Sequence, residues 1–505
     1  MKRLTVLTFG IALLMLLPIK AWSQEAYAWL SSDSLTFTFC YDNLKSSREG
    51  TTFGLSDDWT SQTTTVETVV FNPEFANVKP TSTKRWFSSM SHITEIPTLG
   101  YLNTSNVTDM SYMFNGCKGL KILNLSSFNT ASVTNMDYMF CRCTGLTSLN
   151  LSSFNTASVT TMCDMFYYCK SLTSLNLSSF NTSSVKNMSE MFSYCSGLKN
   201  LDLSSFNTAS VTDMSFMFNH CSGLTSLNLS SFNTESVSTM RYMFGYCESL
   251  LSLNLNNFNT AKVKLMDMMF CYCMSLTSLD LSSFNTAAVT TMGCMFSYCS
   301  GLISINLSSF NTEKLQYMSR MFEGCSSLKN LNLSSFNTAA VRDMFNTFYN
   351  CSSLTSLDLS NFNTKKVTDM SSMFNSSINL TTIYVGDDWS TQAVTNSSNM
   401  FKNCSSLVGS MGTTYDASHV DATYAHIDGG TSNPGYLSEK VNFLLGDVNG
   451  DGDVNIVDVT DLIDYLLMGE DVVTINLDAA DVNQDNNVTI ADVTELIDIL
   501  LGVTP

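Results

Sequence analysis

Residues 172–195 read LTSLNLSSFNTSSVKNMSEMFSYC, and this phrase returns every 26 residues through most of the 505-residue chain. One phenylalanine of the phrase marks the register: Phe128, Phe154, Phe180, Phe206, Phe232, Phe258, Phe284, Phe310, Phe336 and Phe362. A period of this length predicts stacked units whose hydrophobic core continues from one turn to the next. A stack of this kind is an extended surface, which favours recognition over chemistry as the function.

Each unit carries two hydrophobic periodicities. Leu175 and Leu177 alternate with polar residues, which is typical of a short strand with one buried face. A second stripe has the spacing of a helix face: Met162, Met165, Phe166, Cys169 and Leu172. The sequence therefore predicts an α/β repeat in which each turn is one strand plus one short helix.

The spacing L-x-x-L-x-L in a unit of this length is a leucine-rich-repeat signature. The longer phrase V-T-x-M-x-x-M-F-x-x-C-x-x-L resembles the BspA-type leucine-rich-repeat surface proteins of host-associated bacteria, over roughly residues 25 to 440. The resemblance implies display on the cell surface, adhesion, and binding of host or matrix proteins.

The register of the repeat predicts the domain organisation. Residues 106–375 form the solenoid, and the less regular flanks form an N-terminal cap (24–105) and a C-terminal cap (376–440), because the ends of a solenoid expose its core. Residues 35–39 and 69–71 are expected strands of the first cap. Trp86-Phe87 is a degenerate copy of the Met-Phe pair, and Met400-Phe401 is a Met-Phe pair that arrives one residue late.

The chain opens with Lys2 and Arg3, an apolar run over residues 4–17, and Ala21-Trp22-Ser23, which predicts a signal peptide over residues 1–23. We therefore expect a secreted or cell-surface protein without a transmembrane anchor. The net charge of −19 is concentrated at the other end: residues 446–505 hold 14 of the 44 acidic residues and none of the 25 basic ones. The sequence has no stripe of basic residues of the kind that indicates nucleic-acid binding.

Most of the 16 cysteines occupy one position of the repeat, inside the apolar stripe: Cys117, Cys143, Cys169, Cys195, Cys221, Cys247, Cys273, Cys299, Cys325, Cys351 and Cys404. We interpret this column as small buried hydrophobic side chains. Four others lie off the column and are the better candidates for disulfide bridges: Cys141, Cys163, Cys271 and Cys294.

The tail contains two loops with the oxygen-ligand spacing of an EF-hand calcium site. The first offers Asp447, Asn449, Asp451, Asp453, Asn455 and Asp458, with Gly452 at the turn. The second offers Asp481, Asn483, Asp485, Asn487, Thr489 and Asp492. An apolar helical stripe follows each loop, and we expect each loop to bind one Ca2+ and each stripe to form one helix.

A duplicated loop and helix with Asp as the twelfth residue of the loop resembles a type I dockerin, over residues 446–502. The resemblance implies a small all-α, calcium-dependent module (441–505) that docks into a cohesin-like partner. The residues before the last ligand are often Ser or Thr in dockerins but are Ile456-Val457 and Ile490-Ala491 here, which makes the partner an open question. A calcium-stabilised stalk is the alternative interpretation.

Two exposed columns could bind a ligand. The polar column of the strands alternates Asn or Asp with Ser, either as a solvated face or as a track for sugars or protein backbones. The residue before the Cys column is aromatic over six turns: Tyr168, Tyr194, His220, Tyr246, Tyr272 and Tyr298. Tyr is enriched at binding hot spots, but a half-buried ladder that packs between turns explains this column equally well.

The four histidines are scattered, and no catalytic constellation is visible, so we predict that the protein is not an enzyme. The expected function is binding and adhesion through the solenoid, to host or matrix proteins or glycans, with a calcium-dependent docking tail. The alternative is a non-catalytic component of an extracellular dockerin–cohesin-type complex that acts on polysaccharides.

Overall fold

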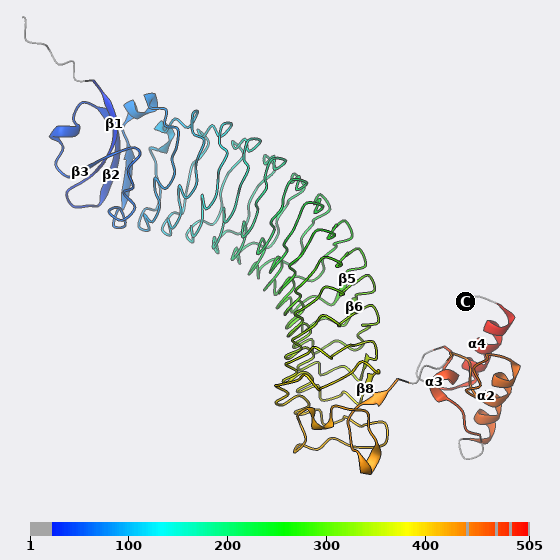
Figure 1. Cartoon of the computed structure of the whole chain (residues 1–505). Helices are drawn as coiled ribbons and strands as arrows, with labels where there is room; N and C mark the ends of the chain where they lie inside the picture. The colour runs from blue at the N-terminus through cyan, green and yellow to red at the C-terminus, as the bar shows by residue number, and fades with distance from the viewer. Residues whose placement is uncertain (1–22, 441–443, 470–472, 484–486, 503–505) are drawn as a thin grey trace, which may run out of the picture. The chain divides into compact units, whose positions relative to one another are not determined.

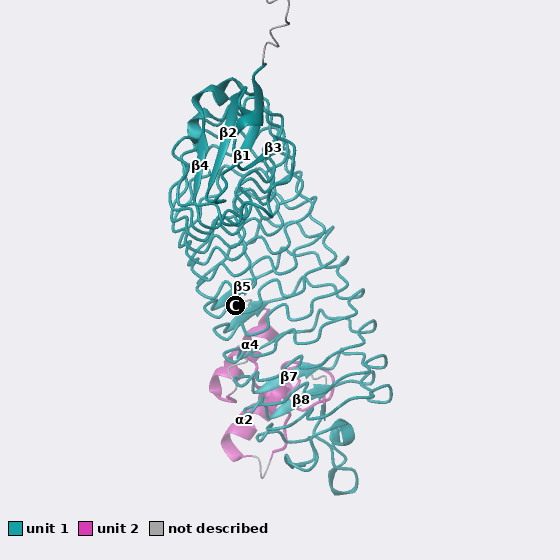
Figure 2. Cartoon of the chain, turned by 90° about the vertical axis from the view of Figure 1, so that its left-hand side faces the viewer, with its two compact units in different colours: residues 1–438 teal, residues 439–505 magenta. Residues whose placement is uncertain are grey.

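The computed structural model describes residues 23–440, 444–469, 473–483 and 487–502. The chain divides into two compact units, residues 1–438 and 439–505 (Figures 1 and 2). Nearly all of the predicted signal peptide lies outside the described residues. No helix among the described residues combines the length and the apolar composition needed to cross a membrane.

Unit 1 begins with a four-stranded sheet of order β3-β1-β2-β4. Its strands are β1 (Glu25–Leu30), β2 (Thr36–Asp42), β3 (Thr51–Gly54) and β4 (Thr68–Phe71). The strands expected at residues 35–39 and 69–71 are thus confirmed. Phe39 packs on Phe71 and on Trp86, so the aromatic core of the sheet covers the start of the repeat stack.

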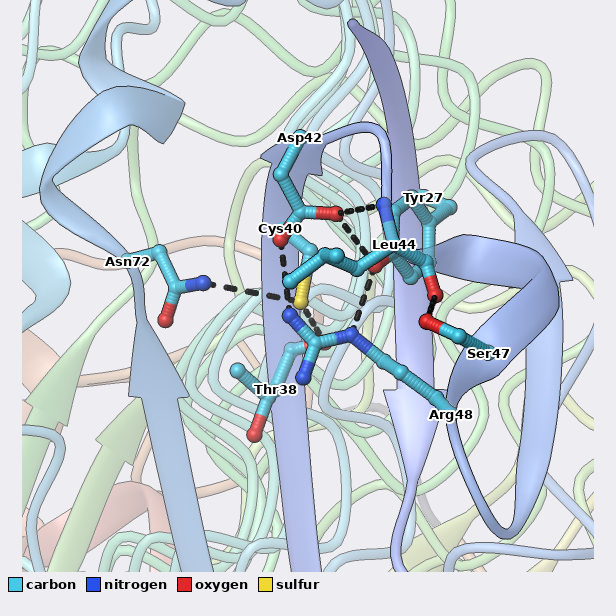
Figure 3. A network of polar contacts seen from close by, with 8 residues as sticks. All are labelled: Tyr27, Thr38, Cys40, Asp42, Leu44, Ser47, Arg48 and Asn72. Carbon is cyan, nitrogen blue, oxygen red and sulfur yellow. Dashed lines mark hydrogen bonds and ion pairs between the residues drawn. The ribbon is translucent and has the colours of Figure 1, made fainter. Parts of the chain in front are cut away.

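A polar network ties the loop after β2 to this sheet (Figure 3). The Tyr27 hydroxyl donates a hydrogen bond to Asp42, and Arg48 donates to both residues at 2.6 and 2.7 Å. Burial acts to raise the pKa of Asp42, but these hydrogen bonds and the Arg48 charge outweigh it and lower the pKa. The network fixes residues 42–48 against the edge of the cap.

The repeat unit differs from the predicted strand plus helix, because its Met-rich half is a series of turns. Within one turn of the stack, Met165 N and Cys169 N donate to carbonyls three residues back, whereas Asp164 N and Phe166 N donate to the next repeat. Asp164 and Tyr168 have positive φ (55° and 59°), which interrupts a right-handed helix. The expectation of short helices in the solenoid was therefore wrong.

The physical reason is competition for the backbone N–H groups. An α-helix uses every N–H within its own segment. In the stack, alternate N–H groups instead pair with the carbonyls of the neighbouring repeat, as in Met162 N to Asn187 O at 3.1 Å. Successive turns still bring Met162, Met165, Phe166 and Cys169 to the core, so the burial pattern matches a helix although the backbone does not.

The leucine segments form regular strands in only part of the stack. These are the parallel pairs β5 (Ser278–Asp280) with β6 (Ser304–Asn306) and β7 (Ser356–Leu359) with β8 (Thr382–Val385). In most leucine segments, with or without a regular strand, the Asn or Asp side chain accepts the N–H two residues on, as in Asn176 and Asp280. This Asx turn ends the extended stretch and keeps the segments short.

A continuous parallel ladder lies at a different point of the repeat, just before the first Met. It passes from Ser82 through Asp109, Asn135 and Thr161 and continues to Asn396 with one bridge per repeat. The sequence analysis did not predict this ladder, which arises from backbone pairing between neighbouring repeats.

The core of unit 1 is a set of columns that run the length of the stack. The Met-Phe phenylalanines stack from Phe114 to Phe374 with ring centroids 5.6–5.8 Å apart and nearly parallel planes. Both ends extend the column, since Phe87 stacks on Phe114 and Phe401 stacks on Phe374. The irregular Met-Phe pairs of the caps are therefore real turns of the same core.

Buried threonines join adjacent repeats by two hydrogen bonds each. Thr208 Oγ1 donates to Asn233 O and accepts from Asn233 N, both at 2.8 Å. The side chain is fully buried, so its hydroxyl satisfies backbone groups that water does not reach. The same pair recurs along the stack, for example between Thr156 and Asn181.

The cysteine column is buried as predicted, and it has a polar role that the sequence analysis missed. Cys195 Sγ donates to Phe166 O in the preceding repeat at 3.1 Å. Where Ser377 replaces the cysteine, its hydroxyl donates to Phe348 O at 2.8 Å and keeps the same hydrogen bond. All 16 cysteines are free thiols, so the bridges expected from Cys141, Cys163, Cys271 and Cys294 are not formed.

We expect the eleven column thiols to resist modification in the native protein. Burial raises the pKa of these thiols, for example that of Cys195, and only the thiolate is an efficient nucleophile. A thiol-reactive dye at pH 7.5 should label at most the partly exposed Cys163 and Cys294, and should label all 16 thiols in urea. Rapid labelling of most column cysteines without urea would contradict this packing.

Unit 1 closes with short 3-10 helices and a sheet of order β7-β8-β9, with β9 at Ser438–Glu439. Asp428 holds this end together by accepting backbone hydrogen bonds from Met411, Thr413, Gly430 and Gly435. Burial acts to raise the pKa of Asp428, but these hydrogen bonds dominate and hold it well below its usual range. The 3-10 helices of unit 1 are η1 (Lys45–Ser47), η2 (Pro73–Asn77), η3 (Leu99–Tyr101), η4 (Ala422–Tyr424) and η5 (Gly430–Ser432).

Unit 2 contains α2 (Ile456–Met468), α3 (Leu477–Ala480) and α4 (Ile490–Leu501). The helix predicted after each loop is confirmed, and α3 was not predicted. Val459 and Leu462 of α2 pack with Val493 and Leu496 of α4 in a small core. These four residues occupy equivalent positions in the two apolar stripes. The duplicated segment therefore forms two helices that pack against each other.

Candidate functional site

The first acidic loop has the backbone of a tight ligand-binding turn. Gly450 and Gly452 have φ of 75° and 94°, in the left-handed region that glycine adopts without strain. Asn449 Oδ1 accepts from Asp451 N, and Asp451 Oδ1 accepts from Asp453 N. These Asx turns give the alternate side chains of the loop a regular arrangement.

The two ends of the loop are its most buried acidic residues. Asp447 is 5% exposed, and its oxygens accept from Asp451 N and Gly452 N. Asp458 is fully buried and accepts from Val448 N at 2.8 Å and Asn455 N at 2.8 Å. Asn455 and Asp458 also form the capping box of α2, so two predicted ligands start the helix as well.

The second loop repeats this arrangement where it is described. Thr489 and Asp492 form the capping box of α4, and Asp492 Oδ1 accepts from Asn483 N at 3.1 Å. Asp481 and Asn487 also have interaction partners. Asp485 lies outside the described residues, so this part of the predicted site has no structural description.

The donor set fits calcium, although the carboxylates do not surround one point. In the described part of the chain, no three His, Cys, Asp or Glu side chains form a group that could hold a metal. However, calcium coordination also uses Asn and backbone carbonyl oxygens, which such a group leaves out. Hard oxygen donors on alternate residues, glycine at the turn and two buried carboxylates are the chemistry of a calcium loop.

The tyrosine column of unit 1 lies at one of the two left-handed positions of the repeat. Tyr194, His220 and Tyr246 have φ of 56–60°, and their rings stack at 4.2 and 4.0 Å. The stack continues through Tyr272 to Tyr298 at 4.6 and 4.7 Å, and Tyr168 joins it with a tilted ring. The expected ladder is confirmed, and its rings keep one exposed side.

Sequence reasoning missed the left-handed backbone and a second column beside the first. Gly116, Gly324, Asn350 and Asn403 occupy the tyrosine position in other repeats, and Gly and Asn are the residues that favour positive φ. That substitution pattern was a readable signal against a helix. In the second column, Tyr112 stacks on Tyr138 and Phe216 on Tyr242, both at 4.4 Å.

The polar column of the leucine segments is a backbone-capping device. Asn150, Asn176 and Asp202 each accept the N–H of the serine two residues on. The side-chain oxygens are thereby engaged within their own turn. This contact explains why Asn or Asp recurs at an exposed position, and it favours the solvated-face interpretation.

Stacked 26-residue leucine-rich turns followed by paired calcium loops and helices define a leucine-rich-repeat protein with a dockerin tail. Its sequence matches the family described as "Mycoplasma protein of unknown function, DUF285" over residues 81–200, 172–271, 246–357 and 318–434, and the chain belongs to this BspA-like family. Residues 445–501 match the type I dockerin domain. Dockerin type I domains bind calcium and imply a cohesin-type partner.

Solved structures of bacterial leucine-rich-repeat proteins are similar to this chain. A leucine-rich repeat protein from Bacteroides ovatus is 18% identical, with 75% of this chain and 87% of that one covered and a TM-score of 0.39. One from Eubacterium ventriosum is 14% identical, with 85% and 97% covered and a TM-score of 0.33. A leucine rich cell surface protein from Faecalibacterium prausnitzii is 14% identical, with 76% and 94% covered and a TM-score of 0.24.

No curated protein matches the sequence. No family described as catalytic is among the matches. BspA-like and dockerin-bearing proteins are typically extracellular or surface-bound.

Proposed function

We propose that this protein is an exported, non-catalytic adhesion protein whose solenoid binds host or matrix proteins or glycans through the tyrosine column. The observation that carries the proposal is the ladder from Tyr194 to Tyr298, because stacked rings held at fixed spacing form a rigid amphipathic surface. Tyr supplies large contact area and a polar hydroxyl, which suits it to binding hot spots. The tail serves as a separate, calcium-dependent docking module with two ions.

A triple substitution of Tyr194, Tyr246 and Tyr272 by Ser tests the column. We expect at least about a tenfold loss of affinity for the ligand identified on a glycan and matrix-protein array, since hot-spot residues contribute about 2 kcal/mol or more each. The matched control replaces Ser152, Ser178 and Ser204 by Ala on the capped polar column. Unchanged affinity in a folded tyrosine variant would exclude the column as the binding surface.

Exposed apolar residues on unit 2 favour a second candidate function, a component of a dockerin–cohesin-type complex acting on polysaccharides. Ile456 and Ile490, at the starts of α2 and α4, are 68% and 70% exposed. Leu467 and Leu501 at the helix ends are 76% and 71% exposed. Apolar surface of this extent on a small module is typical of a docking surface.

Surface plasmon resonance against a panel of type I cohesin domains tests this second function. We expect the full chain to bind at least one cohesin in calcium and none in EDTA. The double variant Ile456→Ser, Ile490→Ser should bind at least about tenfold more weakly, because each change removes about 1.5–3 kcal/mol of apolar burial. The control Thr460→Ser, Thr494→Ser changes the same helix faces without removing a large apolar group. Absence of cohesin binding in calcium would contradict the docking role.

A further inference from the structure

The sequence variation between repeats is concentrated on one face of unit 1. The leucine segments and their Asn and Ser residues hardly change, whereas several positions of the Met-rich half differ from turn to turn. We call three of these positions the turn face. Its columns run through Tyr112, Tyr138, Asp164, Glu190 and Phe216; through Asn115, Cys141, Tyr167, Ser193 and Asn219; and through Gly116, Arg142, Tyr168, Tyr194 and His220. A constant scaffold with a variable face is the arrangement expected of a recognition surface.

The N-terminal end of the turn face contains a cavity of about 560 Å3. All three columns contribute to its lining, together with Ser89, Ser91 and Lys118. This volume lies within the range of about 300–1,000 Å3 that small-molecule sites occupy. The cavity is therefore large enough for a ligand of several polar groups and lies where the repeats vary.

Aromatic rings form one part of the cavity lining. Tyr112 and Tyr138 stack face to face at 4.4 Å with an interplanar angle of 6°, so each ring covers one face of the other. Arg85 lies over the Tyr112 ring at 5.1 Å, and the stacked pair therefore lines the cavity mainly with ring edges. Tyr167 lines the cavity as well, with the Arg142 guanidinium 5.9 Å from its ring centre.

Charged groups of both signs also line the cavity, namely Asp164, Glu190, Arg142 and Lys118. Asp164 is 5% exposed, and neither Asp164 nor Glu190 takes part in an ion pair among the described residues. Burial raises the pKa of both carboxyl groups, and the charges of Asp164 and Asp213 add to the rise at Glu190. Hydrogen-bond donors from a ligand would stabilise these carboxylates.

We propose that this cavity binds a neutral saccharide, with its C–H groups against the stacked Tyr112–Tyr138 pair and its hydroxyls between the carboxylates and Arg142. Arg142 and Lys118 only donate hydrogen bonds, whereas ionised Asp164 and Glu190 only accept them. A sugar hydroxyl does both, so one ring satisfies both sets. The two cations balance the two carboxylates, which gives a charged ligand no net attraction. This inference rests on the proposed binding function and names a site and ligand class for it.

Saturation-transfer NMR on the full chain tests the cavity, with cellotriose, xylotriose, maltotriose and triacetylchitotriose as neutral probes. Choline and inorganic phosphate are the cationic and anionic probes. We expect at least one trisaccharide to show transfer to its ring protons, and neither charged probe to do so. Absence of transfer to all four trisaccharides, or transfer to choline or phosphate, would overturn the proposal.

Two substitutions test whether the trisaccharide binds in this cavity. Tyr138→Ala removes one ring of the stacked pair, and Glu190→Gln keeps the size of the side chain while removing its charge, so a fold defect cannot explain both. Each should weaken binding of the trisaccharide at least tenfold, whereas Ser308→Ala, on the exposed and capped polar column, should not. Binding that survives both changes overturns the cavity as the site. If that binding is lost when Tyr194, Tyr246 and Tyr272 are replaced together, the general binding function stands although the cavity proposal fails.

Discussion

Calcium removal should unfold unit 2 and leave unit 1 intact. Residues 446–505 carry 14 acidic residues without a basic one. Within the described part of the chain, the buried Asp447 and Asp458 accept hydrogen bonds from backbone N–H groups. Like charges at this density disfavour a compact state, and two Ca2+ ions would supply four positive charges. At a calcium concentration of 100 times Kd, each ion adds about 2.7 kcal/mol to the stability of the folded state.

The fold itself provides a clean readout of this transition. Among the described residues, α-helix occurs only in unit 2, so the helical circular dichroism band reports the tail. We expect the band to fall in EDTA and to recover with calcium, and calorimetry to give a stoichiometry of two. An equally helical and equally heat-stable chain in EDTA would refute the metal assignment.

A substitution that changes only the charge of a loop residue distinguishes the loss of a metal ligand from the loss of the helix cap. Asp458→Ala would remove both a ligand and the capping box, whereas Asp451→Asn keeps the Asx turn and removes only a loop charge. Asp451→Asn should abolish or weaken one of the two sites. The control Asp461→Asn, on α2 outside the loop, removes the same charge and should leave the stoichiometry at two.

Phe206→Ala should be the most damaging single change in the solenoid, with a loss of about 3–5 kcal/mol. Phe206 is 2% exposed, and its ring stacks on Phe180 at 6.4 Å, so truncation leaves a cavity between turns. Because each repeat is stabilised by its neighbours, the defect should lower the midpoint of urea unfolding for unit 1 as a whole.

Two control variants set the scale for this prediction. Phe206→Leu retains most of the apolar volume and should lose clearly less stability. Ser226→Ala, exposed on a leucine segment, should stay within about 0.5 kcal/mol of the wild type. If Phe206→Ala unfolds at the same urea concentration as the wild type, the phenylalanine column that contains Phe206 does not stabilise the core.

The sequence alone was sufficient to predict the repeat, the buried columns, and the acidic loops and helices of the tail. The 26-residue period requires stacked turns, and residues such as Leu177, Phe206 and Cys195 are buried as their spacing indicates. The two acidic loops and the helices that follow them were also readable, because ligand spacing and helix periodicity are local properties. The family and domain matches agree with both interpretations.

Only the tertiary structure decided the backbone of the Met-rich half. A spacing of i, i+3, i+4 and i+7 fits an α-helix and also fits a succession of turns, and the choice depends on whether N–H groups such as that of Asp164 find partners within the segment or in the next repeat. The same packing places Tyr168 and Asp164 at left-handed positions side by side on one face. The cavity of the turn face follows from contacts between residues 26 and more apart, and a pattern read along one repeat contains no information about them.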